Sequence, residues 1–132
     1  MISLVPTPIG NLGDITRRAV EILENADRIA CEDTRQTGKL LAHLGIRGKP
    51  LVSLHEHNEV RRIPELIAAA QSGESIAVVS DAGMPGVSDP GYRIVQACLE
   101  ADVELEVLPG PSAVLTALVG SGLPVHAFHF HG

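Results

Sequence analysis

Short apolar runs alternate with amphipathic helical patterns along the chain, and this alternation restricts the fold more than any other feature. Strands are expected at residues 2–5, 28–31, 51–54, 75–80 and 103–108. Helices are expected at residues 15–25, 37–44, 58–72, 92–101 and 112–120. Strands joined by helical crossovers lie parallel, and right-handed crossovers place helices on both faces of the sheet. The sequence therefore predicts a three-layer α/β sandwich with a mostly parallel five-stranded sheet.

Two of the expected strands differ in their polar content. The run IAVV at 76–79 has no polar alternation, which is typical of a central parallel strand covered on both faces. Glu104 and Glu106 alternate with apolar residues in the last strand, as expected for a strand at the edge of the sheet.

The helix ends also carry sequence signals. Asp14 is expected to cap the first helix, and Asn58 the third. Pro64 interrupts the third helical pattern, so that helix either kinks there or begins near Ile63. Asp89 is expected to cap the helix that starts near residue 92.

Composition fits a folded domain inside the cell. Hydrophobic residues make up 45% of the chain and charged residues 20%, while the aromatic residues are only Tyr92, Phe128 and Phe130, so an aliphatic core is expected. Cys31 and Cys98 lie within apolar patterns and are expected to be buried, reduced thiols. The first residues do not resemble a signal peptide, and no apolar run approaches the ~18–20 residues of a membrane span. We expect a cytoplasmic protein without a membrane segment.

The formal net charge of −6 disfavours a dedicated nucleic-acid binder, which needs clustered Lys and Arg. The basic residues are nevertheless unevenly distributed, because none occurs between Arg62 and Arg93. The first half of the chain contains Arg17, Arg18, Arg35, Lys39, Arg47, Lys49, Arg61 and Arg62. A local basic rim is therefore expected, although Arg17 and Arg18 also fit a solvated helix face.

The segments after the first, fourth and fifth strands are the unusual parts of the sequence. In open α/β sheets, ligands bind at the carboxyl ends of the strands, where the strand order reverses. The segment PTPIGNLGD at 6–14 is stiff, yet it is neither a P-loop nor a GxGxxG motif, and it also fits a simple rigid turn. The segment DAGMPGVSDPG at 81–91 is long and rich in glycine, proline and aspartate, which is costly unless it holds a ligand.

The third segment, PGPSA at 109–113, consists of small residues that let a ligand approach the main chain. Ser112 also fits a simple helix cap. Asp81 stands directly at the end of the fourth strand, where its carboxylate is placed to accept from a ribose hydroxyl or to lie near a cation.

Five motifs in this order resemble the tetrapyrrole methylase superfamily, and the resemblance covers essentially the whole chain. They are PTPIGNLGDIT, EDTR, SLHEHNE, SDAGMPGVSDPGY and LPGPSAVLTAL. Within the superfamily they are similar to the bacterial branch that methylates a cytidine ribose 2′-hydroxyl in the 16S ribosomal RNA of the small subunit. The resemblance implies a two-domain enzyme, usually a homodimer, that holds S-adenosylmethionine in the cleft between its domains.

The resemblance also implies the division of the chain and its cofactor contacts. Residues 1–120 correspond to the N-terminal domain, and residues 121–132 to the start of a linker to a C-terminal domain. The implied cofactor contacts are Ile9, Asp81, Met84, Ser112 and Ala113. Met84 stands where the branch more often has threonine, so a backbone contact is retained there but a hydroxyl contact is not. With half the cleft absent, the 132-residue chain is expected to be inactive by itself.

Transfer to a ribose hydroxyl needs help, because a hydroxyl is a poor nucleophile without a general base or a nearby cation. The candidates are Glu32, Asp33 and Arg35 after the second strand and His55 after the third. Our hypothesis is that Arg35 anchors an RNA phosphate while Glu32, Asp33 or His55 assists the hydroxyl. The alternative for Asp33 is a helix cap.

Other functions fit parts of the sequence. His55 and His57, like the histidines of the 126–131 segment, lack the spacing and partners of a metal site, and no metal is expected. A methylase of a tetrapyrrole precursor shares the donor and differs in the acceptor, but the EDTR and SLHEHNE motifs favour the RNA-modifying branch. A non-catalytic module for nucleotide binding or dimerisation is the third possibility.

Overall fold

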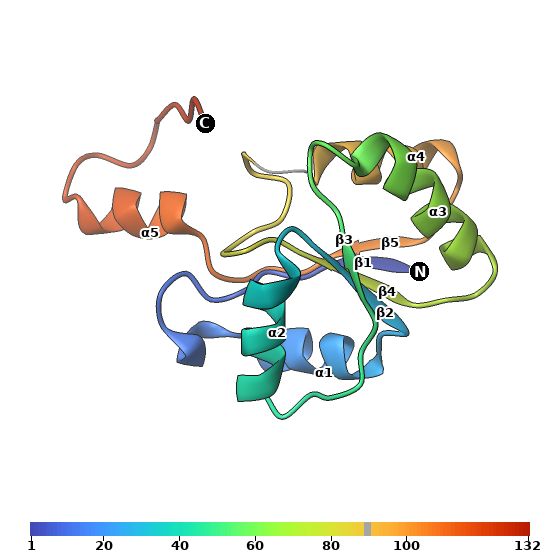
Figure 1. Ribbon diagram of the computed structural model, residues 1–132. Helices are drawn as coiled ribbons and strands as arrows, with labels where there is room; N and C mark the ends of the chain where they lie inside the picture. The colour runs from blue at the N-terminus through green and yellow to red at the C-terminus, as the bar shows by residue number, and fades with distance from the viewer. Residues whose placement is uncertain (89–90) are drawn as a thin grey trace.

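The computed structural model describes residues 1–88 and 91–132. Within these residues the strands are β1 (Ile2–Leu4), β2 (Arg28–Cys31), β3 (Leu51–Ser53), β4 (Ile76–Val79) and β5 (Leu105–Val107). They form a five-stranded sheet in the order β3-β2-β4-β1-β5, and each pairing is parallel (Figure 1). The predicted α/β fold is confirmed, with a sheet that is wholly parallel.

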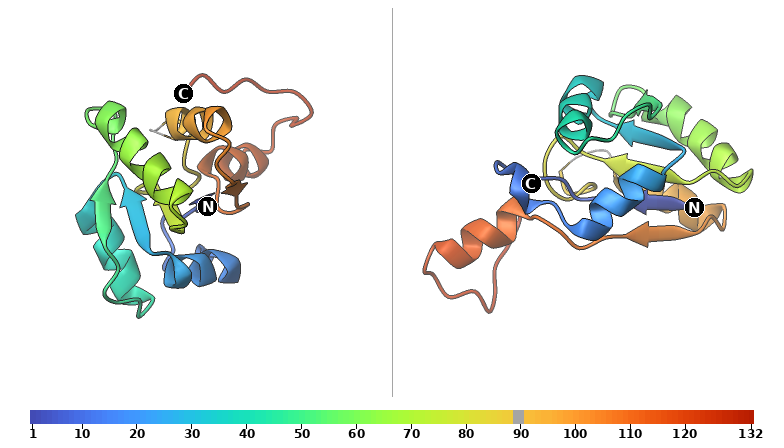
Figure 2. Two further views of the ribbon diagram at one scale, coloured as in Figure 1. Left: turned by 90° about the vertical axis from the view of Figure 1, so that its right-hand side faces the viewer. Right: turned by 90° about the horizontal axis from the view of Figure 1, so that it is seen from below.

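Helices cover both faces of the sheet. The described helices are η1 (Leu12–Asp14), α1 (Arg17–Asn25), α2 (Thr34–His43), α3 (Glu59–Gln71), α4 (Tyr92–Glu100) and α5 (Ala113–Gly120). Figures 1 and 2 show α1 and α2 on one face and α3 and α4 on the other, which gives the three layers. Helix α5 projects beyond the sheet, and the chain after it turns back (Figure 1).

Strand β4 lies in the middle of the core, as its sequence predicts. Ile76 and Val78 point into the apolar cluster under α3 and α4. Ala77 and Val79 point into the cluster under α1 and α2. Strand β5 is at the edge, and its Glu106 pairs with Arg18 of α1.

The first helix begins later than expected, and the assignment of Asp14 as its cap is wrong. Asp14 ends the single turn of η1, which Asn11 caps by accepting from the Gly13 amide at 2.9 Å. Thr16 caps α1 instead, because its hydroxyl accepts from the Ala19 amide at 3.0 Å. The extra turn moves the helix start beyond the reach of the Asp14 carboxylate.

Helix α3 begins at Glu59 and continues through Pro64, so a start near Ile63 is wrong. Pro64 is the sixth residue of the helix and has no amide hydrogen for the carbonyl four residues before it, so the helix gives up one hydrogen bond there and continues. Asn58 holds the cap position, but its side chain makes no capping bond to the described helix. The expected cap Asp89 lies outside the described residues.

Cys31 and Cys98 are both fully buried and unpaired with each other. Burial raises the pKa of both thiols, because the thiolate loses solvation. The predicted burial of both thiols is confirmed, and neither forms a disulfide. Across residues 1–88 and 91–132, none of the helices combines the length and the apolar character of a membrane span.

Candidate functional site

The segments that follow β1, β4 and β5 meet at one edge of the sheet; we call residues 6–11, 81–88 and 109–112 the rim loops. Thr7 and Gly83 exchange two backbone hydrogen bonds of 3.0 Å, which join the first loop to the second. The meeting follows from the topology, because β4, β1 and β5 are neighbours and parallel strands end at the same edge.

Glycines allow the third loop to pack against the other two. A Cβ atom at Gly110 would lie 2.6 Å from Cβ of Pro6, so only a glycine fits there without a shift. A Cβ atom at Gly83 would lie 3.2 Å from Cγ2 of Ile9 and 3.7 Å from the Pro111 carbonyl oxygen. The rim loops therefore form one connected surface made largely of main chain.

Four of the five expected cofactor contacts share one cavity of about 140 Å³, which we call the seat. Ile9 comes from the first loop, Met84 from the second, Ser112 from the third and Ala113 from the first residue of α5. Ser112 also caps α5, because its hydroxyl accepts from the Leu115 amide at 3.4 Å. The structure thus brings together residues more than a hundred positions apart in the sequence.

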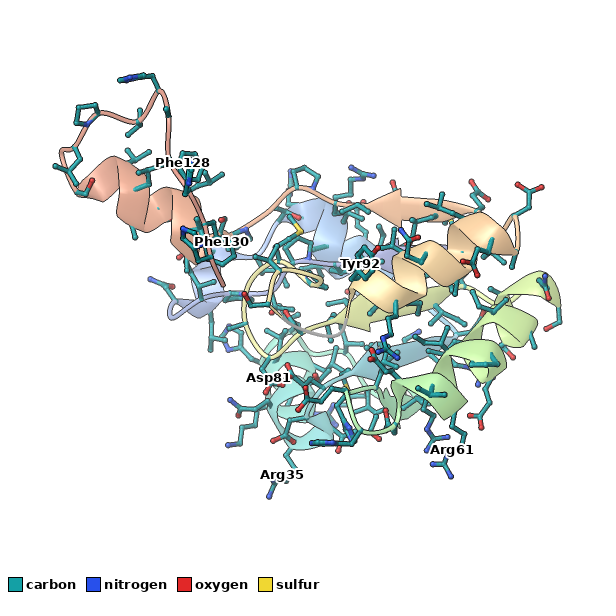
Figure 3. All side chains as sticks on the ribbon, turned by 90° about the horizontal axis from the view of Figure 1, so that it is seen from above. Arg35, Arg61, Asp81, Tyr92, Phe128 and Phe130 are labelled. Atoms are coloured by element: carbon teal, nitrogen blue, oxygen red, sulfur yellow. The ribbon has the colours of Figure 1, made fainter. Side chains whose placement is uncertain are left out.

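The fifth expected contact, Asp81, lies in a neighbouring hollow of about 510 Å³ that shares Ile9 and Ala82 with the seat. Its side chain is exposed, and Oδ1 accepts from the Asp33 amide at 3.1 Å (Figure 3). Lys39 of α2 lines the same hollow. Asp81 is therefore placed beside the seat rather than inside it.

The end of the chain folds back onto the seat. Phe130 is among the residues lining it, and a Cβ atom at Gly132 would lie 3.3 Å from Oγ of Ser88. A volume of about 140 Å³ is small beside the roughly 300–1,000 Å³ of pockets that bind small molecules. Phe130 therefore forms part of the wall of this small cavity.

A larger cavity of about 710 Å³ lies at the carboxyl ends of β2 and β3; we call it the Glu32–His55 cavity. It brings together two of the expected catalytic candidates, Glu32 and His55. Its lining consists of Glu32, His55, Glu56, His57, Glu59, Gly86, Ser88, Tyr92 and Arg93. Asp33 and Arg35 are not among these described lining residues.

Sequence reasoning missed the contribution of α4 to this cavity. Glu59 of α3 is a nearly buried carboxylate whose Oε1 lies 3.0 Å from Nε of Arg93. Tyr92 is 67% exposed at the start of α4. The sequence contained a sign that α4 lies next to the cavity, because the SDPGY motif ends on Tyr92, the first residue of that helix.

Asp33 caps α2, which confirms the alternative interpretation of this residue. Its Oδ1 accepts from the Arg35 amide at 2.9 Å, and the Arg35 guanidinium lies 3.4 Å away. The backbone hydrogen bond, followed by the guanidinium, lowers the pKa of Asp33. Arg35 itself is 88% exposed and extends into solvent, as does Arg61 (Figure 3).

The lowered pKa of Asp33 makes the stability of the chain depend on pH. The ionised cap stabilises the fold above the ordinary pKa of 3.8, and this contribution is lost as the pH falls through the lower folded value. Asp33→Ala should therefore lower the melting temperature at pH 7, with the difference from wild type shrinking toward pH 2. Thermal denaturation across this range tests the expectation, with Asp14→Ala as the control. A difference that does not change with pH would contradict it.

Several residues of the expected basic rim have partners within the fold. Arg62 lies 3.0 Å from Glu65, Lys49 donates to the Ala26 carbonyl at 2.8 Å, and Arg18 pairs with Glu106. Arg35 lies beside Asp33, and Lys39 lines the hollow that contains Asp81. Within the described part of the chain, no cluster of three or more His, Cys, Asp or Glu residues is arranged to hold a metal ion.

The chain is similar to proteins of known sequence and structure along nearly its whole length. The family model for Tetrapyrrole (Corrin/Porphyrin) Methylases matches residues 1–131. A Hydrogenobaculum protein named ribosomal RNA small subunit methyltransferase I is 53% identical over 129 residues, which are 98% of this chain and 56% of that protein. A Vibrio cholerae protein of the same name is 55% identical over 132 residues, which are 100% of this chain and 46% of that protein.

Solved structures are also similar to this chain in fold. The uroporphyrin-III-C-methyltransferase of Thermus thermophilus matches with a TM-score of 0.71 and 26% identity, covering 93% of this chain and 53% of that one. An Aeropyrum pernix protein matches in fold with a TM-score of 0.78 at 23% identity, covering 98% of this chain and 45% of that one. The chain spans about half the length of the curated relatives that it matches. It belongs to the tetrapyrrole (corrin/porphyrin) methylase family.

Proposed function

We propose that this chain is the part of an S-adenosylmethionine-dependent methyltransferase that binds the donor and meets the acceptor, a cytidine ribose 2′-hydroxyl in the 16S RNA of the small ribosomal subunit. The names of the Hydrogenobaculum and Vibrio cholerae relatives support the RNA acceptor. The same relatives support a cytoplasmic enzyme. The family resemblance supports a homodimer and a role of residues 121–132 in leading to a second domain.

One observation carries the proposal: a single loop separates the seat from the Glu32–His55 cavity. Gly83 and Met84 line the seat, Gly86 lines the other cavity, and Ser88 lines both. A methyl group transferred between two bound molecules needs donor and acceptor on neighbouring sites, and most of the catalytic effect is their alignment. The 81–88 loop provides such a boundary.

The residues present fit the proposed donor. The seat offers the apolar side chains of Ile9 and Met84 and the short side chains of Ser112 and Ala113. Close packing of glycine against proline in the rim loops lets an adenosine lie against the main chain. The exposed carboxylate of Asp81, in the hollow next to the seat, is placed to accept from a ribose hydroxyl of the donor.

The chemistry requires little covalent participation by the protein. When bound, S-adenosylmethionine supplies a methyl group whose bond to sulfur breaks, leaving its electron pair on sulfur, as the ribose oxygen forms the new C–O bond. The proton of the hydroxyl must pass to a base near the acceptor. Glu32 lines the Glu32–His55 cavity, whereas the Asp33 carboxylate caps α2 and has a lowered pKa, which makes it a weaker base. We therefore assign the proton to Glu32 and leave Arg35 as the phosphate anchor.

Calorimetry with S-adenosylhomocysteine tests the donor site. The chain should bind this compound and should not bind ATP comparably. Ala113→Tyr, which fills the seat, should abolish binding, whereas Ala42→Tyr, on the exposed surface of α2, should leave it unchanged. The proposed function would be wrong if the chain bound ATP as tightly as S-adenosylhomocysteine, or if Ala113→Tyr still bound S-adenosylhomocysteine.

Removal of the Phe130 ring should strengthen donor binding, because the ring occupies part of the seat. Phe130 is 51% exposed, so displacing it re-exposes about half of its ~200 Å², at most ~2.5 kcal/mol. The segment after α5 gains conformational entropy when Phe130 leaves the seat, and this gain offsets part of the cost. We expect Phe130→Ala to bind S-adenosylhomocysteine roughly threefold to tenfold more tightly, because no ring then has to leave the seat before the compound enters.

Phe128→Ala is the matched control, because Phe128 has similar exposure, 48%, and is not among the described residues of the seat. Its affinity should equal that of wild type. Weaker binding by Phe130→Ala would show instead that the ring contacts the ligand and helps to hold it.

A further inference from the structure

The side chain of Asn58 is turned toward the end of β3 and makes a set of bonds there. Its Oδ1 accepts from the His55 amide at 2.9 Å. Its Nδ2 lies 3.0 Å from the Ser53 carbonyl oxygen and 2.9 Å from the Ser53 hydroxyl. A backbone amide only donates and a carbonyl only accepts, so these partners determine which atom of the Asn58 amide is oxygen and which is nitrogen.

The same amide nitrogen faces the ring of His55. Nδ2 of Asn58 lies 3.2 Å from Nε2 of His55. Nδ2 has two hydrogens, and Ser53 and the ring both lie within hydrogen-bond distance of it. An amide nitrogen donates and does not accept, so Nε2 must be the acceptor and carries no hydrogen. The ring is then the neutral tautomer with its hydrogen on Nδ1.

The remaining ring nitrogen has no partner in the described part of the structure. Nδ1 of His55 is buried and makes no hydrogen bond. His55 nevertheless belongs to the wall of the Glu32–His55 cavity. With Nδ1 protonated, the lone pair of Nε2 is the one that could take a proton, and Asn58 already engages it.

We propose that Asn58 is a positioning residue that holds His55 as the neutral Nδ1–H tautomer. Its consequence for catalysis rests on the proposed function: His55 is excluded as the base for the ribose hydroxyl. Asn58 follows His55 by three residues in the SLHEHNE motif, so one short loop contains both the ring and the group that fixes its protonation.

Nuclear magnetic resonance of the ¹⁵N-labelled 132-residue chain measures the tautomer directly. Long-range ¹H–¹⁵N spectra at pH 7 should show His55 with a protonated Nδ1 and an unprotonated Nε2. The reverse assignment, or a ring protonated on both nitrogens, would overturn the proposal. This measurement is made on the wild-type chain, so it tests the proposal even if a substitution prevents folding.

Asn58→Asp tests the causal role of the amide. A carboxylate retains the acceptor for the His55 amide but turns the donor that faces Nε2 into an acceptor, so the hydrogen should move to Nε2. Asn25→Asp is the matched control: Asn25 also bonds through its amide nitrogen, to the Glu21 carbonyl at 2.7 Å, but on the exposed surface of α1. An unchanged His55 tautomer in folded Asn58→Asp would overturn the proposal.

S-adenosylhomocysteine binding, measured on the same samples, separates this inference from the proposed function. Loss of the proposed function would appear as a wild-type chain that does not bind the compound, while the tautomer of His55 is read independently. If the wild-type chain binds the compound but His55 has its hydrogen on Nε2, the inference about Asn58 is wrong and the proposed function stands.

Discussion

Gly91→Ala should lower the free energy of unfolding by about 2–4 kcal/mol, because overpacking that forces the backbone to move carries costs of this order. A Cβ atom at this position would lie 2.3 Å from both N and Cα of Gly86 and 3.0 Å from the Pro85 carbonyl carbon. These are backbone atoms, so no rotation of a side chain relieves the contact. The 81–88 loop would have to move away from the start of α4.

Urea denaturation of Gly91→Ala beside Gly38→Ala measures this effect. Gly38 lies inside α2, and a Cβ atom there would meet nothing within 4 Å among the described residues. Alanine is the better helix former by roughly 0.5–1 kcal/mol, so Gly38→Ala should stabilise the chain. Wild-type stability of Gly91→Ala would show that the two segments separate freely.

The fold could be predicted from the sequence because its elements carry strong, independent patterns. The IAVV run of β4 indicated a strand covered on both faces, and it lies between two apolar clusters. Glu106 indicated the edge strand β5, and the pairing places it there. Parallel crossovers then left few possible arrangements.

The helix starts were harder to predict, because several polar side chains compete for each cap. Asp14 and Thr16 both suited the first helix, and the extra turn of η1 decided between them. Asn58 stands at the cap position of α3, but its amide bonds to Ser53 and His55. Which side chain caps a helix depends on where the fold places the end of the neighbouring strand. The local sequence pattern does not contain that information.

The location of the site at one edge of the sheet could be predicted from the sequence. Which residues line each of its cavities could not. Topology placed the segments after β1, β4 and β5 at one edge of the sheet. It did not reveal that Asp81 faces a hollow beside the seat or that Arg93 of α4 pairs with Glu59 of α3. Phe130 reaches the seat through a segment without regular structure, whose path no periodicity indicates.

Gly110→Ala should weaken binding of S-adenosylhomocysteine at least tenfold, about 1.4 kcal/mol. Its Cβ atom would lie 2.6 Å from Cβ and 2.9 Å from Cγ of Pro6. The proline ring is closed onto its own backbone, so it cannot rotate aside as an ordinary side chain can. The third rim loop must then move away from the first, and this shifts Ser112 and Ala113, which line the seat together with Ile9.

Calorimetry on Gly110→Ala and Gly120→Ala separates this local effect from a general one. Gly120 ends α5, and a Cβ atom there would meet nothing within 4 Å in the described structure, so affinity should be unchanged. Thermal denaturation of both variants shows whether the chain still folds at the titration temperature. If folded Gly110→Ala binds as tightly as wild type, donor binding does not depend on contact between the first and third rim loops, and the seat must lie elsewhere.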